Sequence, residues 1–513
     1  MPVFRPLPLL AGLALLLSAC AHRQFFQPDA RLPKAAAQPL PAGSDTVRDV
    51  TAGRQYARHG GLYQLFFGRH HRAAWATPVA AKILDLTTAV PGGLRPAKLG
   101  GGFNSTSLSL TDSAGRPWVL RTLDKDPARA VPRLLRGTAL VNYLRDNVSA
   151  THPYAALVVP PLAQAVAVPH AAPRLFYVPA HAPQLPGDSL AKLRGQLVLL
   201  EEKFSGPGNR PGLPRFSTRL VDSRALFERV NADGPGLVFG PDLLRARLLD
   251  AWLGDWDRHA GQWTWASGPD RFGRPLARYH AVPKDRDMVF YRADDGLVPW
   301  LLTRPVTIRH WATFRPRYTD PLGLMENGEF LDKRLLNGLT RPDFRRVAAA
   351  MQAQLTDSVL AAALARLPAP VRRTDGPALH AALQARRAAL PAFADQFYRN
   401  LARRVSIGGT AGADTFAVQR NGDSLTVTVR SQSGRLFRYA RTFHRRETRQ
   451  IALEGLGGDD VLLLLPPGPG AARGPRLLFF GGAGQEVRPR TGRVRFRQGA
   501  RRAGRAYDKL PAE

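Results

Sequence analysis

Residues 248–290 constrain the fold more than any other stretch, because they place several charged side chains in an otherwise apolar and aromatic setting. Leu249 and Trp252 belong to an apolar pattern at near-helical spacing, which indicates the buried face of a helix. We expect an aromatic strand over 262–265 and a second strand over 277–282, separated by a polar turn. The sequence therefore predicts a buried helix and two adjacent strands whose ends meet at one place.

The segments that follow these elements are rich in carboxylates. The expected helix runs into residues 254–259 (GDWDRH), and the second strand runs into residues 283–287 (PKDRD). Carboxylates at the ends of neighbouring strands are a common way to hold a divalent cation beside a phosphate. The alternative is a plain ion-pair network at the loop junctions, because Asp257 and Asp285 each precede an arginine. The sequence leaves both interpretations open.

The order of polar residues in these loops resembles the catalytic segment of atypical protein kinases, the HipA-like and spore-coat CotH-like kinases. The chain resembles even more closely a group of uncharacterised bacterial envelope lipoproteins with a DWDRH…QW…PKDRD pattern. The resemblance implies catalytic roles for Asp257 and His259. It also implies metal binding by Gln262 and by Asp285, with Asp287 as the less favoured alternative to Asp285, and magnesium or manganese with ATP as the cofactors.

A glycine cluster upstream is a candidate for the phosphate-binding half of such a site. Gly100, Gly101 and Gly102 lie on an expected hairpin, and glycine lets backbone amides approach a phosphate closely. In the kinase pattern the return strand has the phosphate-binding lysine, and here the matching position is Arg121, with Lys125 as a substitute. Arginine binds phosphate but is not equivalent to lysine. A purely structural glycine hairpin is the alternative.

The strand expected over 197–202 ends where the resemblance puts the hinge between two lobes. Glu201 would there accept a hydrogen bond from an adenine amine, and a surface acid at a strand end is the alternative. The predicted fold class is α+β, with a bilobal atypical protein-kinase-like domain that has a helical C-lobe, followed by a separate C-terminal all-β domain. The predicted order is a signal peptide over 1–20, a tether over 21–50, a kinase-like domain over 51–404 (N-lobe about 51–203, C-lobe about 204–404), a β-domain over 405–495 and a basic tail over 496–513.

Two long helices are expected in the C-lobe. Thr340 is a plausible N-cap with Asp343 in the first turn, and apolar residues follow at helical spacing. Pro368 and Pro370 are expected to end this pattern, and a second helix is expected over 377–404.

From residue 405 the apolar pattern changes to alternation, with a turn at Asn421-Gly422, which predicts a β-hairpin and a β-domain. Residues 455–462 and 481–486 each approximate the calcium-binding glycine-aspartate nonapeptide of β-rolls, and each departs from it at one position. Calcium binding in the β-domain and simple turn-forming glycines are both left open, with the turns favoured.

Cys20 is the only cysteine, so neither an intrachain disulfide nor a cysteine-based metal site can form. It follows Arg5 and an apolar run over 7–17, which is too short to span a bilayer. The segment resembles a bacterial lipoprotein signal peptide, which implies lipidation of Cys20 and an outer-membrane location in the cell envelope. His70 and His71 are adjacent and point in different directions, so we do not expect them to share a metal.

The formal net charge is +33, from 73 Lys and Arg against 40 Asp and Glu. Such a surface attracts anionic lipid, lipopolysaccharide or nucleic acid. The arginines are spread along the chain. We therefore attribute the positive charge to a general compositional bias of the coding sequence in preference to binding of an anionic envelope ligand. The sequence has no zinc-finger, helix-turn-helix or aromatic RNA-binding motif, so nucleic acid is not an expected partner.

Three functions remain open at this point. The first is a lipid-anchored, kinase-like phosphotransferase that uses ATP and a divalent metal. The second is an inactive kinase-like scaffold or ligand-binding lipoprotein. Three facts favour it: arginine at the lysine position, glutamine at the asparagine position, and the scarcity of ATP outside the cytoplasm. The third is a metal-dependent phosphoester hydrolase or the partner of one, because such modules are joined to some of the similar envelope proteins.

Overall fold

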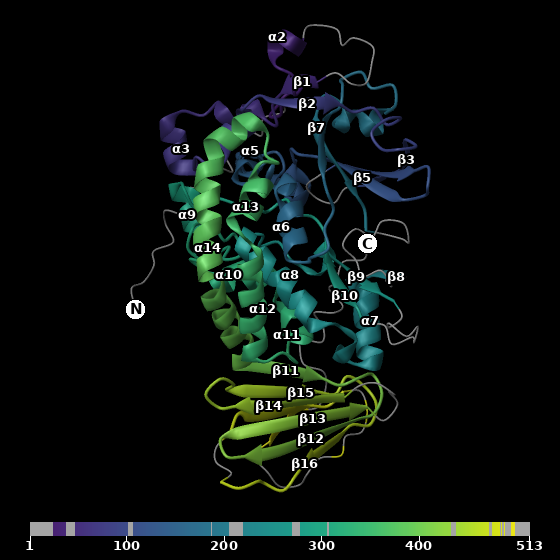
Figure 1. Ribbon diagram of the computed structural model, residues 1–513, viewed down its shortest axis with the longest axis vertical. Coiled ribbons are helices and arrows are strands. Elements are labelled where there is room, and N and C mark those ends of the chain that lie inside the picture. The colour runs from purple at the N-terminus through teal and green to yellow at the C-terminus, as the bar shows by residue number, and fades with distance from the viewer. Residues whose placement is uncertain are drawn as a thin grey trace.

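The computed structural model describes residues 24–36, 47–100, 106–185, 187–204, 219–268, 278–304, 307–431, 438–470, 474–482, 484, 487 and 494–497. These residues form a mixture of helices and four β-sheets. In the view of Figure 1 the largest sheet lies at the top, most helices in the middle and the C-terminal sheets at the bottom. Cys20 lies outside the described residues, so its lipidation stays a prediction.

A seven-stranded sheet organises the N-terminal part of the chain. Its strand order is β1-β2-β6-β7-β5-β4-β3, and every neighbouring pair is antiparallel except β2 with β6. The strands are β1 (Val47–Val50), β2 (Val79–Ile83), β3 (Leu94–Gly100), β4 (Ser107–Asp112), β5 (Pro117–Thr122), β6 (Arg174–Tyr177) and β7 (Leu197–Glu202).

The strands expected from the sequence in this region are confirmed. In β4 the burial alternates residue by residue, and Leu108 and Leu110 join a hydrophobic cluster on one face of the sheet. β5 contains the predicted return strand, and β7 has the predicted bounds. Only one face of β4 is covered by the core. Its apolar residues therefore alternate with polar ones, and this alternation predicted the strand.

Parts of the segment predicted to be a tether, residues 21–50, pack against the fold, while Pro33 and Lys34 are exposed. Gln27 and Ala30 are buried, and Nε2 of Gln27 donates to the carbonyl oxygen of Thr51 at 2.8 Å. β1 adds four residues to the edge of the seven-stranded sheet. These residues therefore contact the fold more than a free tether would, because a proline-rich composition does not reveal isolated hydrogen-bonded contacts.

A three-stranded antiparallel sheet, in the order β10-β9-β8, is formed by one strand before and two strands after the helix predicted over residues 248–253. α8 (Gly240–Leu253) is almost entirely buried, as its apolar pattern indicated. Gly254 ends it in a left-handed conformation with a φ of 75°, which glycine adopts without strain. The strands are β8 (Arg219–Asp222), β9 (Trp263–Ser267) and β10 (His280–Pro283).

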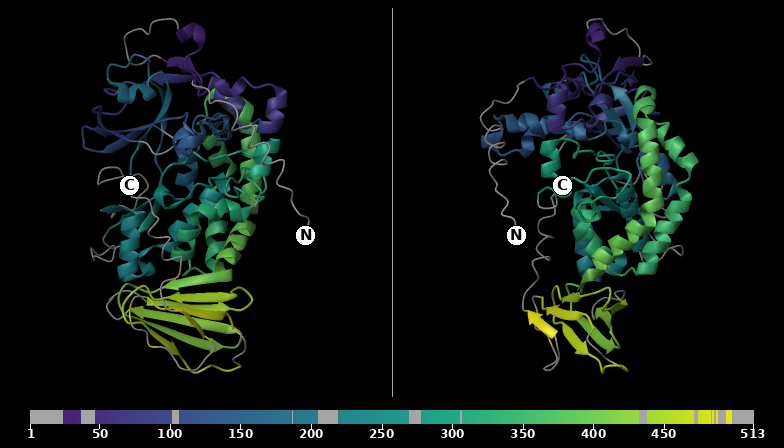
Figure 2. Two further views of the ribbon diagram at one scale, coloured as in Figure 1. Left: turned by 180° about the vertical axis from the view of Figure 1, so that it is seen from behind. Right: turned by 90° about the vertical axis from the view of Figure 1, so that its left-hand side faces the viewer.

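Helices fill the middle of the molecule (Figures 1 and 2). Thr340 is the N-cap of α12 as predicted, and Asp343 completes a reciprocal capping box there. No single helix among the described residues is long and apolar enough to cross a membrane, and only the bent pair α12 and α13 passes that test together. The remaining helices are α2 (Pro33–Ala36), α3 (Gly61–Phe67), α4 (Arg72–Ala76), α5 (Ala139–Asp146), α6 (Val159–Ala165), α7 (Ser223–Asp233), α9 (Leu297–Leu302), α10 (Pro321–Met325), α11 (Glu329–Leu335), α12 (Arg341–Gln354), α13 (Asp357–Leu364) and α14 (Ala369–Arg403).

The last helix differs from its prediction. α14 begins at Ala369 instead of residue 377 and continues through Pro377 and Pro391. Pro370 lies in its first turn, where proline removes no helical hydrogen bond. The helix packs along α12 and α8, and this tertiary packing offsets the bonds lost at the internal prolines.

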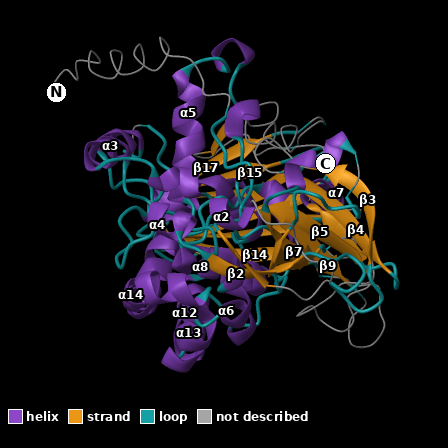
Figure 3. Ribbon diagram, turned by 90° about the horizontal axis from the view of Figure 1, so that it is seen from above, coloured by secondary structure: helices purple, strands orange, loops and turns teal. Residues whose placement is uncertain are grey.

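One hydrophobic core extends through both predicted lobes. Trp75 and Leu162 belong to the same buried cluster as Trp252 and Phe393, while the other face of the seven-stranded sheet has a smaller cluster of its own. Figure 3 shows, from above, helices gathered on one side of the molecule and strands on the other. The bilobal layout stays a prediction, since residues 51–203 and 204–404 share this core.

Two four-stranded sheets form the C-terminal part, in the orders β11-β15-β17-β18 and β14-β13-β12-β16. A hydrophobic cluster made only of residues after 404 lies within this region. β12 and β13 form the hairpin expected around Asn421-Gly422. The strands are β11 (Arg404–Gly408), β12 (Asp414–Asn421), β13 (Ser424–Ser431), β14 (Arg438–His444), β15 (Gln450–Glu454), β16 (Val461–Leu464), β17 (Arg476–Phe480) and β18 (Val494–Arg497).

The turns of this C-terminal part lie against one another. Asp414 and Asp460 are fully buried, and the backbone N–H of Asp414 donates to Oδ1 of Asp460 at 2.9 Å. A Cβ at Gly455 would collide with the Asp460 carboxylate, so glycine is required there for packing. This contact supports a structural role for the turn over 455–462. The calcium prediction itself is untested, and part of 481–486 lies outside the described residues.

Candidate functional site

The cationic half of the predicted site lies on the seven-stranded sheet. Arg121 is on β5, and Glu201 is on the neighbouring β7. Nη1 of Arg121 donates to Oδ2 of Asp285 at 2.9 Å, and its Nε lies 3.1 Å from Oε1 of Glu201. The Arg121 guanidinium therefore connects the sheet to the acidic loop after β10. The Glu201 carboxylate faces this arginine, and the predicted contact with adenine is untested.

Lys125 is the second cation of the site. Its Nζ forms an ion pair with Oδ2 of Asp287. Burial lowers the pKa of Lys125, and the opposing attraction of Asp285 and, less strongly, of Asp257 limits that effect. The ammonium group thus lies within electrostatic range of the two carboxylates that the sequence assigned to metal binding and to catalysis.

Asp285 adopts a left-handed backbone conformation with a φ of 51°. Aspartate is among the few residue types that tolerate this conformation. Its carbonyl oxygen accepts a hydrogen bond from Nη1 of Arg258 at 2.9 Å. Burial raises the pKa of Asp285, but the charges of Arg121 and Lys125 outweigh it and hold that pKa below its ordinary value. Asp285 is therefore an anion at neutral pH that faces two cations.

Asp257 lies on the loop after α8 and is partly exposed. Its Oδ1 accepts a hydrogen bond from Nδ2 of Asn327 at 3.1 Å. Nε2 of His259 is 3.9 Å from the same oxygen, which is too long for a hydrogen bond. Nδ1 of His259 accepts from the backbone N–H of Gly261, so this ring shapes the loop locally. Nothing in the sequence singled out Asn327, since it reaches the site from a distant segment.

Gln262 lies between the two acidic loops. Its backbone carbonyl accepts from the N–H of Lys284 at 2.9 Å and from Nη2 of Arg258 at 3.0 Å. Gly100 is the last residue of β3 and pairs with Ser107, which in turn pairs with Arg121. Since strands lie about 4.8 Å apart, Gly100 is about 10 Å from Arg121 at the same end of the sheet.

The rest of the glycine cluster, Gly101 and Gly102, lies outside the described residues, so its predicted contact with phosphate is untested.

A buried ion-pair network supports the two acidic loops from below. Arg258 is fully buried and donates to the carbonyl oxygens of Lys284 and Asp285 at 2.8 and 2.9 Å. Arg286 pairs with Asp250 and with Asp255, the latter at 3.1 Å. The arginine and aspartate neighbours therefore do form ion pairs, as the alternative interpretation expected. They do so mainly through Asp250 and Asp255, while Asp285 pairs with Arg121 and lines two small cavities.

Two small cavities adjoin these residues. One has a volume of about 40 Å³ and touches Arg121, Glu201 and Asp285. The other has a volume of about 50 Å³ and touches Lys125 and Asp287 as well. Ligand pockets usually measure about 300–1,000 Å³, so a nucleotide fits only if these side chains separate. Nε of Arg121 is buried and makes no hydrogen bond of good geometry, and its nearest acceptor is the Glu201 carboxylate at 3.1 Å.

Comparisons with known proteins give little further information. No known protein family and no curated protein matches the sequence. Among solved structures, a chain of the HipA, HipB and operator DNA toxin–antitoxin complex of Shewanella oneidensis MR-1 is similar. The identity is 12%, the match covers 62% of this chain and 78% of that chain, and the TM-score is 0.27. At this TM-score the likeness to the toxin–antitoxin chain is weak.

Proposed function

We propose that the chain binds a nucleotide polyphosphate together with a divalent metal at the seam between β5, β7 and the loop after β10. The observation that supports this most is the 2.9 Å pair between Arg121 and Asp285. The Arg121 guanidinium is a group that can bind phosphate, and the Asp285 carboxylate is a group that can bind a metal. They come from segments far apart in the chain and meet at this point. Phosphoryl-transfer sites combine these two groups in this way.

Each site residue has a distinct role in this proposal. Arg121 and Lys125 bind phosphate oxygens once their carboxylate partners are released. Asp285 holds the metal with Gln262, and Asp257 orients an acceptor hydroxyl. A bound metal–nucleotide would supply the phosphoryl group. The cations and carboxylates neutralise each other in its absence, which keeps both stable in a partly buried cleft.

A binding scaffold without turnover is the second candidate. The small volume of the cavities favours it, because the ion pairs must open before any nucleotide enters. Arginine instead of lysine at position 121 favours it as well, since the guanidinium holds two carboxylates at once and is harder to displace.

Nucleotide binding measured by calorimetry tests the proposal. We expect ATP to bind the full chain in detergent only with magnesium or manganese. Arg121→Gln should weaken binding by more than about tenfold, because a charge-assisted contact contributes about 1.5–3 kcal/mol. Arg121→Lys keeps the charge and should retain most of the affinity. Arg95→Gln, on exposed β3, is the matched control and should change nothing. Equal binding by Arg121→Gln and the control would contradict the site.

Release of phosphate or transfer to a hydroxyl acceptor then separates the two candidates. If the wild-type chain binds metal–nucleotide and turns it over, and Asp257→Asn binds but does not, the chain is an enzyme. Binding without any turnover in the wild type indicates the scaffold.

We also propose that Cys20 is lipidated and anchors the protein in the cell envelope. The support is the unique cysteine that follows a short apolar run and small residues. Cys20→Ser should block signal cleavage before residue 20 and abolish attachment of lipid. Unchanged processing and unchanged lipid attachment would refute the anchor.

A further inference from the structure

A second cluster of metal-ligand side chains lies outside the site described above. His71, His152 and Asp375 each place one ligand atom so that all three atoms lie within 4.8 Å of one another. His71 precedes α4, His152 follows a short 3-10 turn, and Asp375 is in α14. We propose that these three residues bind one divalent transition-metal ion. Two imidazoles and one carboxylate suit zinc, iron(II) or cobalt(II) better than magnesium or calcium.

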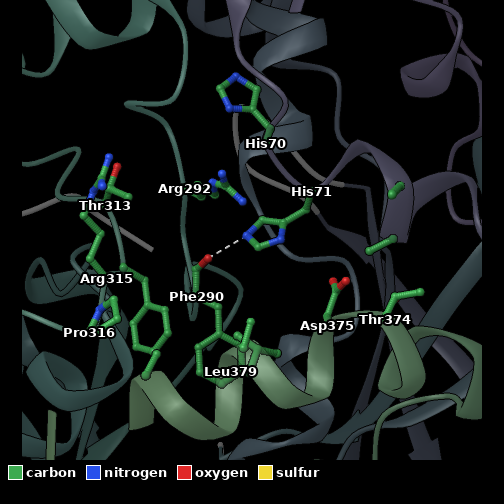
Figure 4. A pocket seen from close by; sticks show the side chains of 15 residues that line it. His70, His71, Phe290, Arg292, Thr313, Arg315, Pro316, Thr374, Asp375 and Leu379 are labelled. Atoms are coloured by element: carbon green, nitrogen blue, oxygen red, sulfur yellow. Dashed lines mark hydrogen bonds between the residues drawn. The ribbon is translucent and has the colours of Figure 1, made fainter. Parts of the chain in front are cut away.

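His71 is oriented as a metal ligand usually is. Its Nε2 lies 2.8 Å from the carbonyl oxygen of Phe290, so that nitrogen has the proton and donates it. The lone pair is then on Nδ1. Figure 4 shows His71 and Asp375 side chains turned toward each other across the edge of a cavity. A second-shell carbonyl that fixes the tautomer of a ligand histidine is a regular feature of metal sites.

His152 supplies a buried nitrogen whose nearest acceptor, the Asp375 carboxylate, is too far for an ordinary hydrogen bond. Its side chain is 0% exposed, and its Nε2 makes no hydrogen bond. That nitrogen lies 3.4 Å from Oδ2 of Asp375, which is longer than an ordinary hydrogen bond. A buried polar atom without a partner destabilises the fold, and a bound cation would satisfy it.

The site would demand one local change. Nδ1 of His152 accepts from the backbone N–H of Tyr154 at 3.2 Å, which places the ring proton on Nε2. Metal at Nε2 requires the proton on Nδ1, so this long backbone contact is given up on binding. The competing interpretation is a metal-free pair in which His152 shares its proton with Asp375.

Access and an open coordination position come from the cavity beside the cluster. It has a volume of about 360 Å³ and is lined by His71 and Asp375 on one side and by Arg292 and Arg315 on the other. Three protein ligands leave a fourth position free, as in catalytic zinc sites. The position faces a cavity with two guanidinium groups, so a metal-bound water or small anion fits there.

The adjacent histidine, His70, faces another carboxylate. Nδ1 of His70 lies 2.8 Å from Oδ1 of Asp295, away from the cluster. The sequence could not reveal that His71 meets two residues from distant segments instead.

Cobalt and zinc binding to the full chain in detergent, after treatment with a chelator, tests the proposal without nucleotide. We expect about one cobalt ion per chain with visible bands of a four- or five-coordinate site, and its displacement by zinc. Asp375→Asn should weaken zinc binding by more than about tenfold, since even outer partners of metal ligands contribute about 10–100-fold.

Three further variants make the outcome decisive. His71→Gln, which keeps a donor for Phe290, should weaken binding in the same way, and it replaces Asp375→Asn if that variant unfolds. His181→Gln, at an exposed position, and Asp285→Asn, in the proposed nucleotide site, should bind as the wild type does. Absence of stoichiometric binding, or equal binding by all four variants, would overturn the metal site and leave the nucleotide proposal untouched.

Discussion

Arg121 and Asp285 are 164 residues apart in the chain, and their side chains meet at 2.9 Å. The first belongs to the central region of the large sheet, and the second belongs to a loop that a buried arginine network fixes from below. The pair is partly exposed, at 29% and 22% of the two side chains. It is therefore both anchored and accessible, which distinguishes it from the fully buried pairs beneath it.

The buried pair of Arg247 and Asp332 should dominate stability where α8 meets α11. Both side chains are 0% exposed, and Nε of Arg247 donates to Oδ1 of Asp332 at 2.9 Å. Asp332→Ala leaves a buried guanidinium without its main partner and should reduce the free energy of unfolding by about 3–5 kcal/mol in urea.

The next pair on the same helix provides the control. Lys333 and Glu329 are exposed, so Glu329→Ala should change the free energy by less than about 1 kcal/mol. Similar losses for Asp332→Ala and Glu329→Ala would show that burial does not decide the effect. The double change Arg247→Met with Asp332→Leu should recover much of the lost stability.

Acid should destabilise the contact between α4 and α5 through Asp146. Burial raises the pKa of Asp146, but the hydrogen bonds and charge of Arg72 outweigh it and lower that pKa to about 2. A carboxyl group whose pKa in the folded state lies below its pKa in the unfolded state, about 3.9, stabilises the fold at pH values above 3.9. The contribution, on the order of 2 kcal/mol, should be lost as the pH falls from about 4 to 2.

Urea unfolding at several pH values measures this effect. Asp146→Asn should be less stable than the wild type at pH 6, and its stability should change less between pH 4 and 2. Asp49→Asn, at an exposed position, should follow the wild-type profile. Parallel profiles for the wild type and Asp146→Asn would refute the assignment to this carboxyl.

The junction before the C-terminal sheets should resist protease, contrary to what the change of periodicity near residue 405 suggests. α14 ends at Arg403 and β11 begins at Arg404, with no linker between them. Nδ2 of Asn337 donates to the carbonyl oxygen of Ser406 at 2.7 Å, and Nη1 of Arg334 donates to Oε2 of Glu454 at 2.8 Å.

Brief trypsin treatment should therefore spare the bonds after Arg403 and Arg404, and calorimetry should show one unfolding transition. Glu454→Gln weakens the contact with Arg334 and should separate the transition into two. Early native-state fragments ending between residues 403 and 412 would contradict this account.

Local signals in the sequence predicted local structure well. The alternation in β4, the bounds of β7 and the capping box at Thr340 all depend on residues within a few positions of one another. The continuation of α14 through Pro377 depends instead on packing against α12 and α8, which no local pattern reports.

The candidate site was predictable only in part, for the same reason. Asp257, Gln262 and Asp285 lie in one short stretch of the sequence, so their spacing was enough to indicate two acidic loops. The contacts of Asn327 with Asp257 and of His152 with Asp375 join distant segments. Only the folded chain brings such residues together.

The melting temperature with metal and nucleotide is the most direct test of the central claim, that Asp285 and Arg121 form a metal and phosphate site. A ligand that binds only the native state at about 100 times its Kd stabilises it by about 2.7 kcal/mol. We predict a rise for the wild-type chain with manganese and ATP together, and none with ATP alone. Asp285→Asn should remain folded and lose the rise. If the wild type shows no rise, and Asp285→Asn merely melts at a lower temperature, Asp285 belongs to a structural salt bridge and the proposed function is wrong.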